Sequence, residues 1–153
     1  MAKKDTFQLQ PVLWYKEKLE ETRRQELAEL QEDHRRQLAD LLELQRQHID
    51  HVERLRDRQS RHRLDVEYIL QEMQFLTGIA RAVEIQAQRV EEAGKRVEDK
   101  RLELVGIAQE KKMLEKLKDK QHLEFLDAQK KEEAKQVDEI VTTRFSRNLP
   151  GHV

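Results

Sequence analysis

The sequence has no cysteine, only two prolines and four glycines, and few aromatic residues. Without cysteine there is no disulfide, no thiolate metal ligand and no thiol nucleophile. The scarcity of turn-forming and aromatic residues argues against a globular α/β or all-β core. No run of about 18 consecutive apolar residues occurs, and no apolar run follows the first lysines. These absences predict a cytoplasmic protein with no transmembrane helix.

A charge imbalance is also lacking, because 30 basic residues oppose 31 acidic ones and the net charge is −1. A chain without a positive field has no general attraction for nucleic acid or for an anionic membrane. What the sequence does contain is 40% charged residues, with much Glu, Lys, Arg, Gln and Leu. This composition is typical of long helices that bury a single stripe.

The strongest pattern is an apolar or small residue at every third or fourth position from Val66 to Ala108, interrupted only by Arg101. A helix presents such residues as two rows on one face, and a stripe this narrow is buried only against another helix. The large row is Ile69, Leu76, Val83, Val90, Val97 and Leu104. The small row is Val66, Met73, Ala80, Ala87, Gly94, Arg101 and Ala108. The small row predicts a close approach of the two backbones.

The earlier part of the chain supplies the second helix. Apolar residues, mostly leucine, recur from Leu19 to Leu55 with polar gaps at His34 and Gln45. Pro11 marks the helix start, because proline is tolerated in the first turn. A reversal between about 57 and 64 would place Leu41 and Leu42 opposite Ala80, and His34 near Ala87.

The predicted fold is therefore all-α: a long antiparallel two-helix coiled-coil hairpin with an overhanging C-terminal helix. We expect one elongated unit over 1–153, with helix 1 at about 10–58, the turn at about 59–64 and helix 2 at about 65–147. The match of large to small residues favours an intramolecular hairpin, monomeric when free, over a parallel homodimer. A single continuous helix is the alternative. Pairing should run out near residue 114, which leaves 115–147 without an intramolecular partner.

Nothing in the sequence suggests catalysis. It has no Ser-His-Asp order, no phosphate loop and no dinucleotide fingerprint, and a two-helix hairpin offers no enclosed pocket. His48 and His51 lie one turn apart, but without a third ligand they are interpreted as imidazoles beside the helix contact. We expect no enzyme activity, cofactor, metal, small-molecule substrate or nucleic-acid partner. The turn is basic, and is either solvated or in contact with an acidic surface; its arginines are Arg54, Arg56, Arg58, Arg61 and Arg63.

A second line on the later helix steps by four, three and four residues: Phe75, Ile79, Ala82 and Gln86. We expect this line beside the helix contact and exposed, which is typical of a partner surface. Packing of Ile79 alone at the edge of the contact is the simpler interpretation.

Motifs near both ends point to a family. They are Glu115-Lys-Leu-Lys-Asp-Lys-Gln121, Phe125, Val137-Asp-Glu-Ile140 and Arg144-Phe145, with Phe7-Gln-Leu-Gln and Leu13 at the start. Together they resemble the FliJ family of bacterial flagellar (type III) export proteins. The resemblance implies a hairpin similar to the rotor γ subunit of rotary ATPases. It implies insertion of the terminal end into the hexameric export ATPase FliI, contact with the export gate protein FlhA, and assistance to export chaperones.

The resemblance also assigns residues. The gate-contacting line of the family falls on Phe75, Ile79, Ala82 and Gln86, with Gln86 in place of the family's histidine. The terminal residues expected to dock in the ATPase are Phe7, Trp14, Leu117, Gln121, Ile140 and Phe145. The implied location is the cytoplasm, peripheral at the cytoplasmic face of the inner membrane when assembled. A generic coiled-coil scaffold or homodimerisation protein is the alternative function.

Overall fold

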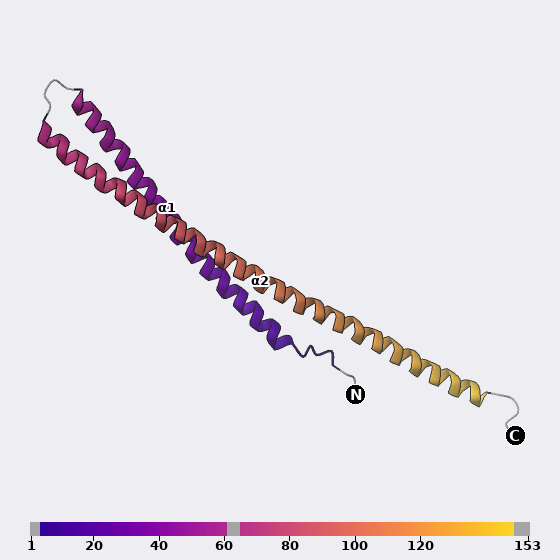
Figure 1. Ribbon diagram of the computed structural model, residues 1–153. Helices are drawn as coiled ribbons and strands as arrows, with labels where there is room; N and C mark the ends of the chain where they lie inside the picture. The colour runs from indigo at the N-terminus through magenta and orange to yellow at the C-terminus, as the bar shows by residue number, and fades with distance from the viewer. Residues whose placement is uncertain (1–3, 61–64, 149–153) are drawn as a thin grey trace. The chain divides into compact units, whose positions relative to one another are not determined.

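The computed structural model describes residues 4–60 and 65–148 and consists of two long helices (Figure 1). Helix α1 spans Gln10–Gln59 and helix α2 spans Val66–Arg147; the described residues contain no strand. The two helices pack against each other, which confirms the all-α hairpin prediction. The expected reversal at about 59–64 lies partly outside the described residues, since 61–64 are not described.

Local sequence explains where the helices begin and end. Pro11 occupies the first turn of α1, where its missing N–H breaks no helical hydrogen bond. At the other end, the Ser60 hydroxyl donates to the Asp57 carbonyl at 2.7 Å. Helix α2 follows Asp65, whose carboxylate accepts a bond from the Tyr68 amide at 3.3 Å and caps the helix.

The contacts divide the chain into two units. The hairpin unit is Leu19–Gly106. The terminal unit is 1–18 with 107–153, of which 4–18 and 107–148 are described. Helix α2 runs through both. The expectation that the chain behaves as one elongated unit stays a prediction.

Within the hairpin unit, polar layers alternate with leucine layers along the line where α1 and α2 meet, which we call the seam. The polar residues that α1 turns inward recur every 14 positions: Glu20 and Arg23, His34 and Gln37, His48 and His51. The α2 residues of the same layers are Glu72, Gln86 and Lys100, which also lie 14 apart. Between these layers α1 turns inward Leu27, Leu30, Leu41 and Leu44, and after the last layer it turns inward Leu55.

Each polar layer joins the two helices directly. His51 Nδ1 lies 3.0 Å from Glu72 Oε2, and Gln86 Nε2 donates to the Gln37 backbone carbonyl at 2.8 Å. In the part of the chain that the structure describes, no buried side-chain nitrogen or oxygen lacks a hydrogen-bond partner. The layers therefore set the register of the hairpin without leaving a buried polar atom unpaired.

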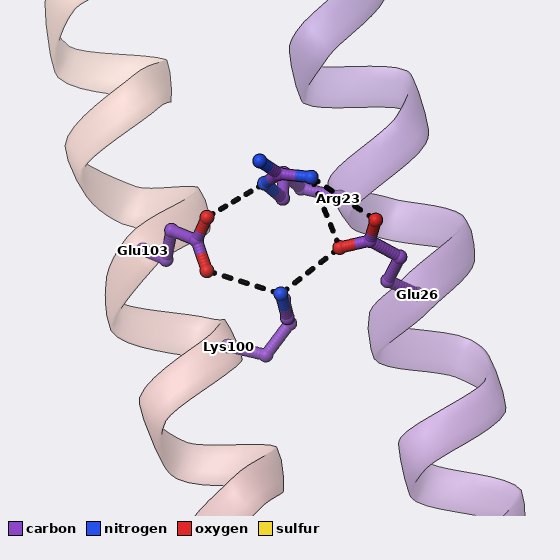
Figure 2. Close-up of polar contacts among 4 residues, drawn as sticks. All are labelled: Arg23, Glu26, Lys100 and Glu103. Atoms are coloured by element: carbon purple, nitrogen blue, oxygen red, sulfur yellow. Dashed lines mark hydrogen bonds and ion pairs between the residues drawn. The ribbon is translucent and has the colours of Figure 1, made fainter.

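The third layer is a closed ring of four charges from both helices (Figure 2). Arg23 Nε donates to Glu103 Oε1 at 2.6 Å, and Arg23 Nη1 donates to Glu26 at 3.0 Å. The Lys100 ammonium bridges Glu26 at 2.9 Å and Glu103 at 3.1 Å. Because these side chains are partly exposed, we expect the ring to add little to the free energy of unfolding. Its main effect is on the alignment of α1 with α2.

The ring also shifts the ionisation of its members. Hydrogen bonding from Lys100 lowers the pKa of both Glu26 and Glu103. Conversely, the bond to Glu103 raises the pKa of Arg23, and the bond to Glu26 raises the pKa of Lys100. All four groups are thus held in their charged forms.

Part of the predicted seam is wrong. The large row of α2 does turn inward, but the small row does not, and Met73, Ala80 and Ala87 are exposed. The seam instead takes the row that contains Ile79, Gln86 and Ala93, which are 6%, 5% and 2% exposed. The predicted register is also shifted. The sequence analysis placed His34 near Ala87, whereas the His34 ring lies beside Gly94, where an added Cβ would be 3.5 Å from His34 Nε2.

The reason lies in the polar layers of α1. The predicted small row places no hydrogen-bonding side chain on α2 opposite Gln37 or His51. The row Glu72, Ile79, Gln86, Ala93 and Lys100 places one opposite each polar layer and still supplies Ile79 and Ala93 to the apolar layers. A buried polar group without a partner costs more than the packing that the small row would gain.

Candidate partner-binding surfaces

The expected gate-contacting line is only half exposed. Phe75 is 47% exposed and its ring stacks beside His51, with ring centroids 4.3 Å apart. Ala82 is partly exposed. Ile79 and Gln86, however, lie in the seam, so the expectation that all four residues are exposed is wrong for these two. Phe75 and Ala82 are thus accessible at the surface, whereas Ile79 and Gln86 lie beneath them.

Gln86 is fixed in place by two bonds. Its amide nitrogen donates to both the backbone carbonyl and the side-chain oxygen of Gln37, each at 2.8 Å. These bonds tie α2 to α1 one helical turn after Ala82, and the side chain is only 5% exposed. It is not available to contact a partner.

The structure reveals an apolar surface that the sequence analysis assigned to the seam. We call it the lateral apolar face; its exposed residues are Leu38, Leu42 and Ile49 of α1 and Met73, Ala80 and Ala87 of α2. A shallow groove along it is lined by Gln45, His48, Ile49, Ala80, Val83 and Glu84. Met73 and Phe75 are about 200° apart around α2, so this face and the Phe75 surface lie on different sides of the hairpin.

The sequence feature that could have revealed the lateral apolar face is the seven-residue spacing of Met73, Ala80 and Ala87. Apolar residues on three adjacent rows of one helix exceed what a single partner helix can bury. One flank therefore had to be exposed, but periodicity does not say which. The polar layers of α1 decide it.

In the terminal unit, four of the six expected docking residues come together. Residues 4–9 precede α1 and lie along α2, where Phe7, Leu117 and Gln121 line one shallow groove. Phe7 also lines a second groove, which includes Trp14. The overhang is accordingly shorter than expected, because these N-terminal residues cover part of the segment 115–125.

The other two expected docking residues lie farther along α2. Every residue from Leu126 to Asn148 is exposed. Four of them form an apolar stripe at helical spacing, which we call the terminal stripe: Val137, Ile140, Val141 and Phe145. Ile140 lies about 28 Å along the helix from Gln121, at about 1.5 Å per residue. The predicted docking residues therefore form two patches.

The described residues contain no group of three or more His, Asp and Glu side chains arranged to hold a metal ion. His51 instead pairs with Glu72 and Phe75, and His48 lines the lateral groove. Of the basic turn, Arg58 stacks over the Tyr68 ring at 4.1 Å, whereas Arg61 and Arg63 are outside the described residues. Over residues 4–60 and 65–148, neither helix has a stretch long and apolar enough to cross a bilayer.

Comparison with known proteins bears on this geometry. The family model described as "Flagellar FliJ protein" matches residues 5–150. Neither the curated proteins nor the solved structures contain a significant match. The family match spans both units and includes all ten residues that the sequence analysis assigned to partner surfaces. By that match the chain belongs to the FliJ family of non-catalytic proteins, and is a component of bacterial flagellar protein export.

Proposed function

We propose that this protein couples the export ATPase FliI to the export gate protein FlhA and assists export chaperones, at the cytoplasmic face of the inner membrane. The observation that carries the proposal is the terminal stripe. A helix gains little stability without packing, so an exposed apolar stripe on an unpaired helix suits a partner that buries it. The hairpin unit, by contrast, already buries its own seam.

The terminal unit is the proposed ATPase-docking part. It carries both patches of expected docking residues: the terminal stripe with Ile140 and Phe145, and the N-terminal patch with Phe7, Trp14, Leu117 and Gln121. The six docking residues themselves are uncharged, whereas charged side chains such as Lys118, Asp119, Lys120 and Glu124 line the same grooves as Phe7. An interior of a ring of ATPase subunits that presents apolar surface to the terminal stripe and polar groups to the N-terminal patch matches that chemistry, and the family resemblance supplies the identity of the ring.

The test is the affinity of the full chain for the purified ATPase. The variant Ile140→Ala with Phe145→Ala should weaken binding at least about tenfold, since each side chain contributes buried apolar area only in the complex. Glu139→Ala with Ser146→Ala, on the opposite side of the same helix turns, is the matched control. Equal affinity of both variants would remove the terminal stripe from the interface.

The hairpin unit is the proposed gate-binding part, through Phe75 and Ala82, with Ile79 and Gln86 holding them from beneath. Phe75→Ala should weaken binding to FlhA. Met73→Ala is the matched control, because Met73 is similarly exposed but lies on the lateral apolar face. Loss with Met73→Ala and not with Phe75→Ala would move the gate surface to the lateral face. Including export chaperones in the same pull-down assays tests the chaperone part.

A homodimerising scaffold is the second candidate function, and the lateral apolar face is the observation that favours it. A second hairpin packed there would bury Leu42, Ile49 and Met73. Sedimentation equilibrium decides between the two: a monomer supports the coupling role, whereas a dimer that Leu42→Lys dissociates supports the scaffold.

A further inference from the structure

The N-terminal residues 4–9, which we call the strap, are held to α2 by two polar contacts. The Gln121 side-chain amide donates to the Thr6 backbone carbonyl at 2.8 Å. The adjacent His122 Nδ1 contacts the Asp5 carboxylate. Two successive residues of α2 thus hold two successive residues of the strap.

The next strap residue is Phe7, which is partly buried against α2. It lines one groove with Leu117 and Gln121, and another with Lys118 and His122. Phe7 therefore lies across the surface of α2 between these residues. Two of the six residues assigned to ATPase docking, Phe7 and Gln121, are engaged within the protein itself.

We propose that the strap is an autoinhibitory latch, which holds Phe7 and Gln121 against α2 in the free protein and must open before a partner can contact them. The proposal rests on the proposed ATPase docking through the terminal unit. Its restraints are weak enough to open, because His122 is 54% exposed and the Thr6 bond is also at the surface.

The latch also gives docking an order. The terminal stripe is exposed in the free protein, whereas the N-terminal patch is partly covered by the strap. A partner that first contacts Ile140 and Phe145 would then have to extend about 28 Å along α2 to reach Gln121 and His122, where it can replace the contacts that Thr6 and Asp5 make with these residues. Binding would proceed from the far end of α2 towards Gln121.

The absence of cysteine allows a direct test. In the full chain carrying Asp5→Cys and His122→Cys, a disulfide or a short bismaleimide bridge locks the strap closed. The matched control is Lys16→Cys with Glu110→Cys, because Lys16 and Glu110 are also in contact and the bridge joins α1 to α2 without restraining the strap. Circular dichroism checks that both proteins remain helical.

We expect the locked form to bind the purified ATPase at least tenfold more weakly than its reduced form, with recovery on reduction of the disulfide. The bridged control should bind like the unmodified protein. Asp5→Ala with His122→Ala, which removes one restraint without changing a docking residue, should bind several-fold more tightly.

Equal or tighter binding by the locked form would overturn the latch, and tighter binding would make the closed strap part of the docking surface. A different result would contradict the proposed function itself. If no form binds the ATPase, the opened variant included, then docking through the terminal unit is wrong, and the latch is overturned with it.

Discussion

Helix α2 carries apolar residues at helical spacing in both units, but it uses them differently. In the hairpin unit Ile79 is 6% exposed and packs against α1, whereas in the terminal unit Phe145 is 68% exposed. The same periodicity therefore indicates a helix that needs a partner, without indicating whether the partner belongs to the chain. In this protein, the hairpin unit buries apolar residues between its own two helices, and the far end of α2 leaves its apolar residues exposed.

This comparison predicts that substitutions in the seam alter stability and that substitutions in the terminal stripe alter binding alone. The largest expected effect is Ile79→Ala. Truncation of a buried isoleucine costs about 2–4 kcal/mol through lost burial and the cavity left behind. Chemical denaturation followed by circular dichroism measures the loss.

The matched control for Ile79→Ala is Ile85→Ala. It is the same change on the same helix, at a position that is 45% exposed. Its cost should stay below about 1 kcal/mol. Similar losses for the two variants would mean that the assignment of Ile79 to the seam is wrong.

The second largest effect is expected from overpacking. Ala93 is 2% exposed, so Ala93→Leu should lower stability by about 1–3 kcal/mol. Ala87→Leu, which the sequence analysis would have placed in the seam, should change the melting temperature little because Ala87 is exposed. The reverse result would restore the small row to the seam.

These two pairs also show what the sequence could and could not predict. The all-α hairpin followed from the scarcity of Gly, Pro and aromatic residues together with the regular spacing from Val66 to Ala108, which only Arg101 interrupts. The start of the first helix followed from Pro11. These features are local, so each is readable from a few neighbouring residues.

The face that α2 buries could not be read from α2 alone. Ala80 and Ala87 fit a close helix contact as well as Ile79 and Ala93 do. The match of small α2 side chains to the large leucines of α1 favoured the small row. The choice depends on pairs far apart in the sequence, such as Gln37 with Gln86. The contact of the strap with Gln121 was missed for a similar reason, since it uses the backbone carbonyl of Thr6 and leaves no periodic signal.

A smaller effect is expected from acid. Because the pKa of Glu26 and of Glu103 is lowered in the folded protein, their contribution is complete above the pKa of an unfolded glutamate, about 4.3. It is lost as the pH falls through the lowered folded-state values. The melting temperature should therefore decrease below about pH 4.3.

Glu26→Gln with Glu103→Gln should make that decrease shallower. Glu29→Gln with Glu53→Gln, at two exposed positions outside the four-charge ring, should leave the pH dependence unchanged. An identical acid profile for all three proteins would show that the ring contributes nothing to folding.

The smallest effect on stability is expected at the far end of α2, where the comparison between the two units is sharpest. Ile140→Ala with Phe145→Ala should leave the denaturation midpoint of the hairpin unchanged, because neither side chain packs against another part of the described chain. For the same reason, backbone amides from Leu126 to Asn148 should exchange with deuterium much faster than those of the hairpin unit, since an unpaired helix opens locally at little cost. Addition of the export ATPase should slow exchange in this segment and leave the seam around Ile79 unaffected. Slow exchange at Ile140 in the free protein would mean that the terminal stripe already has a partner, most simply a second copy of the chain. Dilution to concentrations at which such a dimer dissociates would then restore fast exchange.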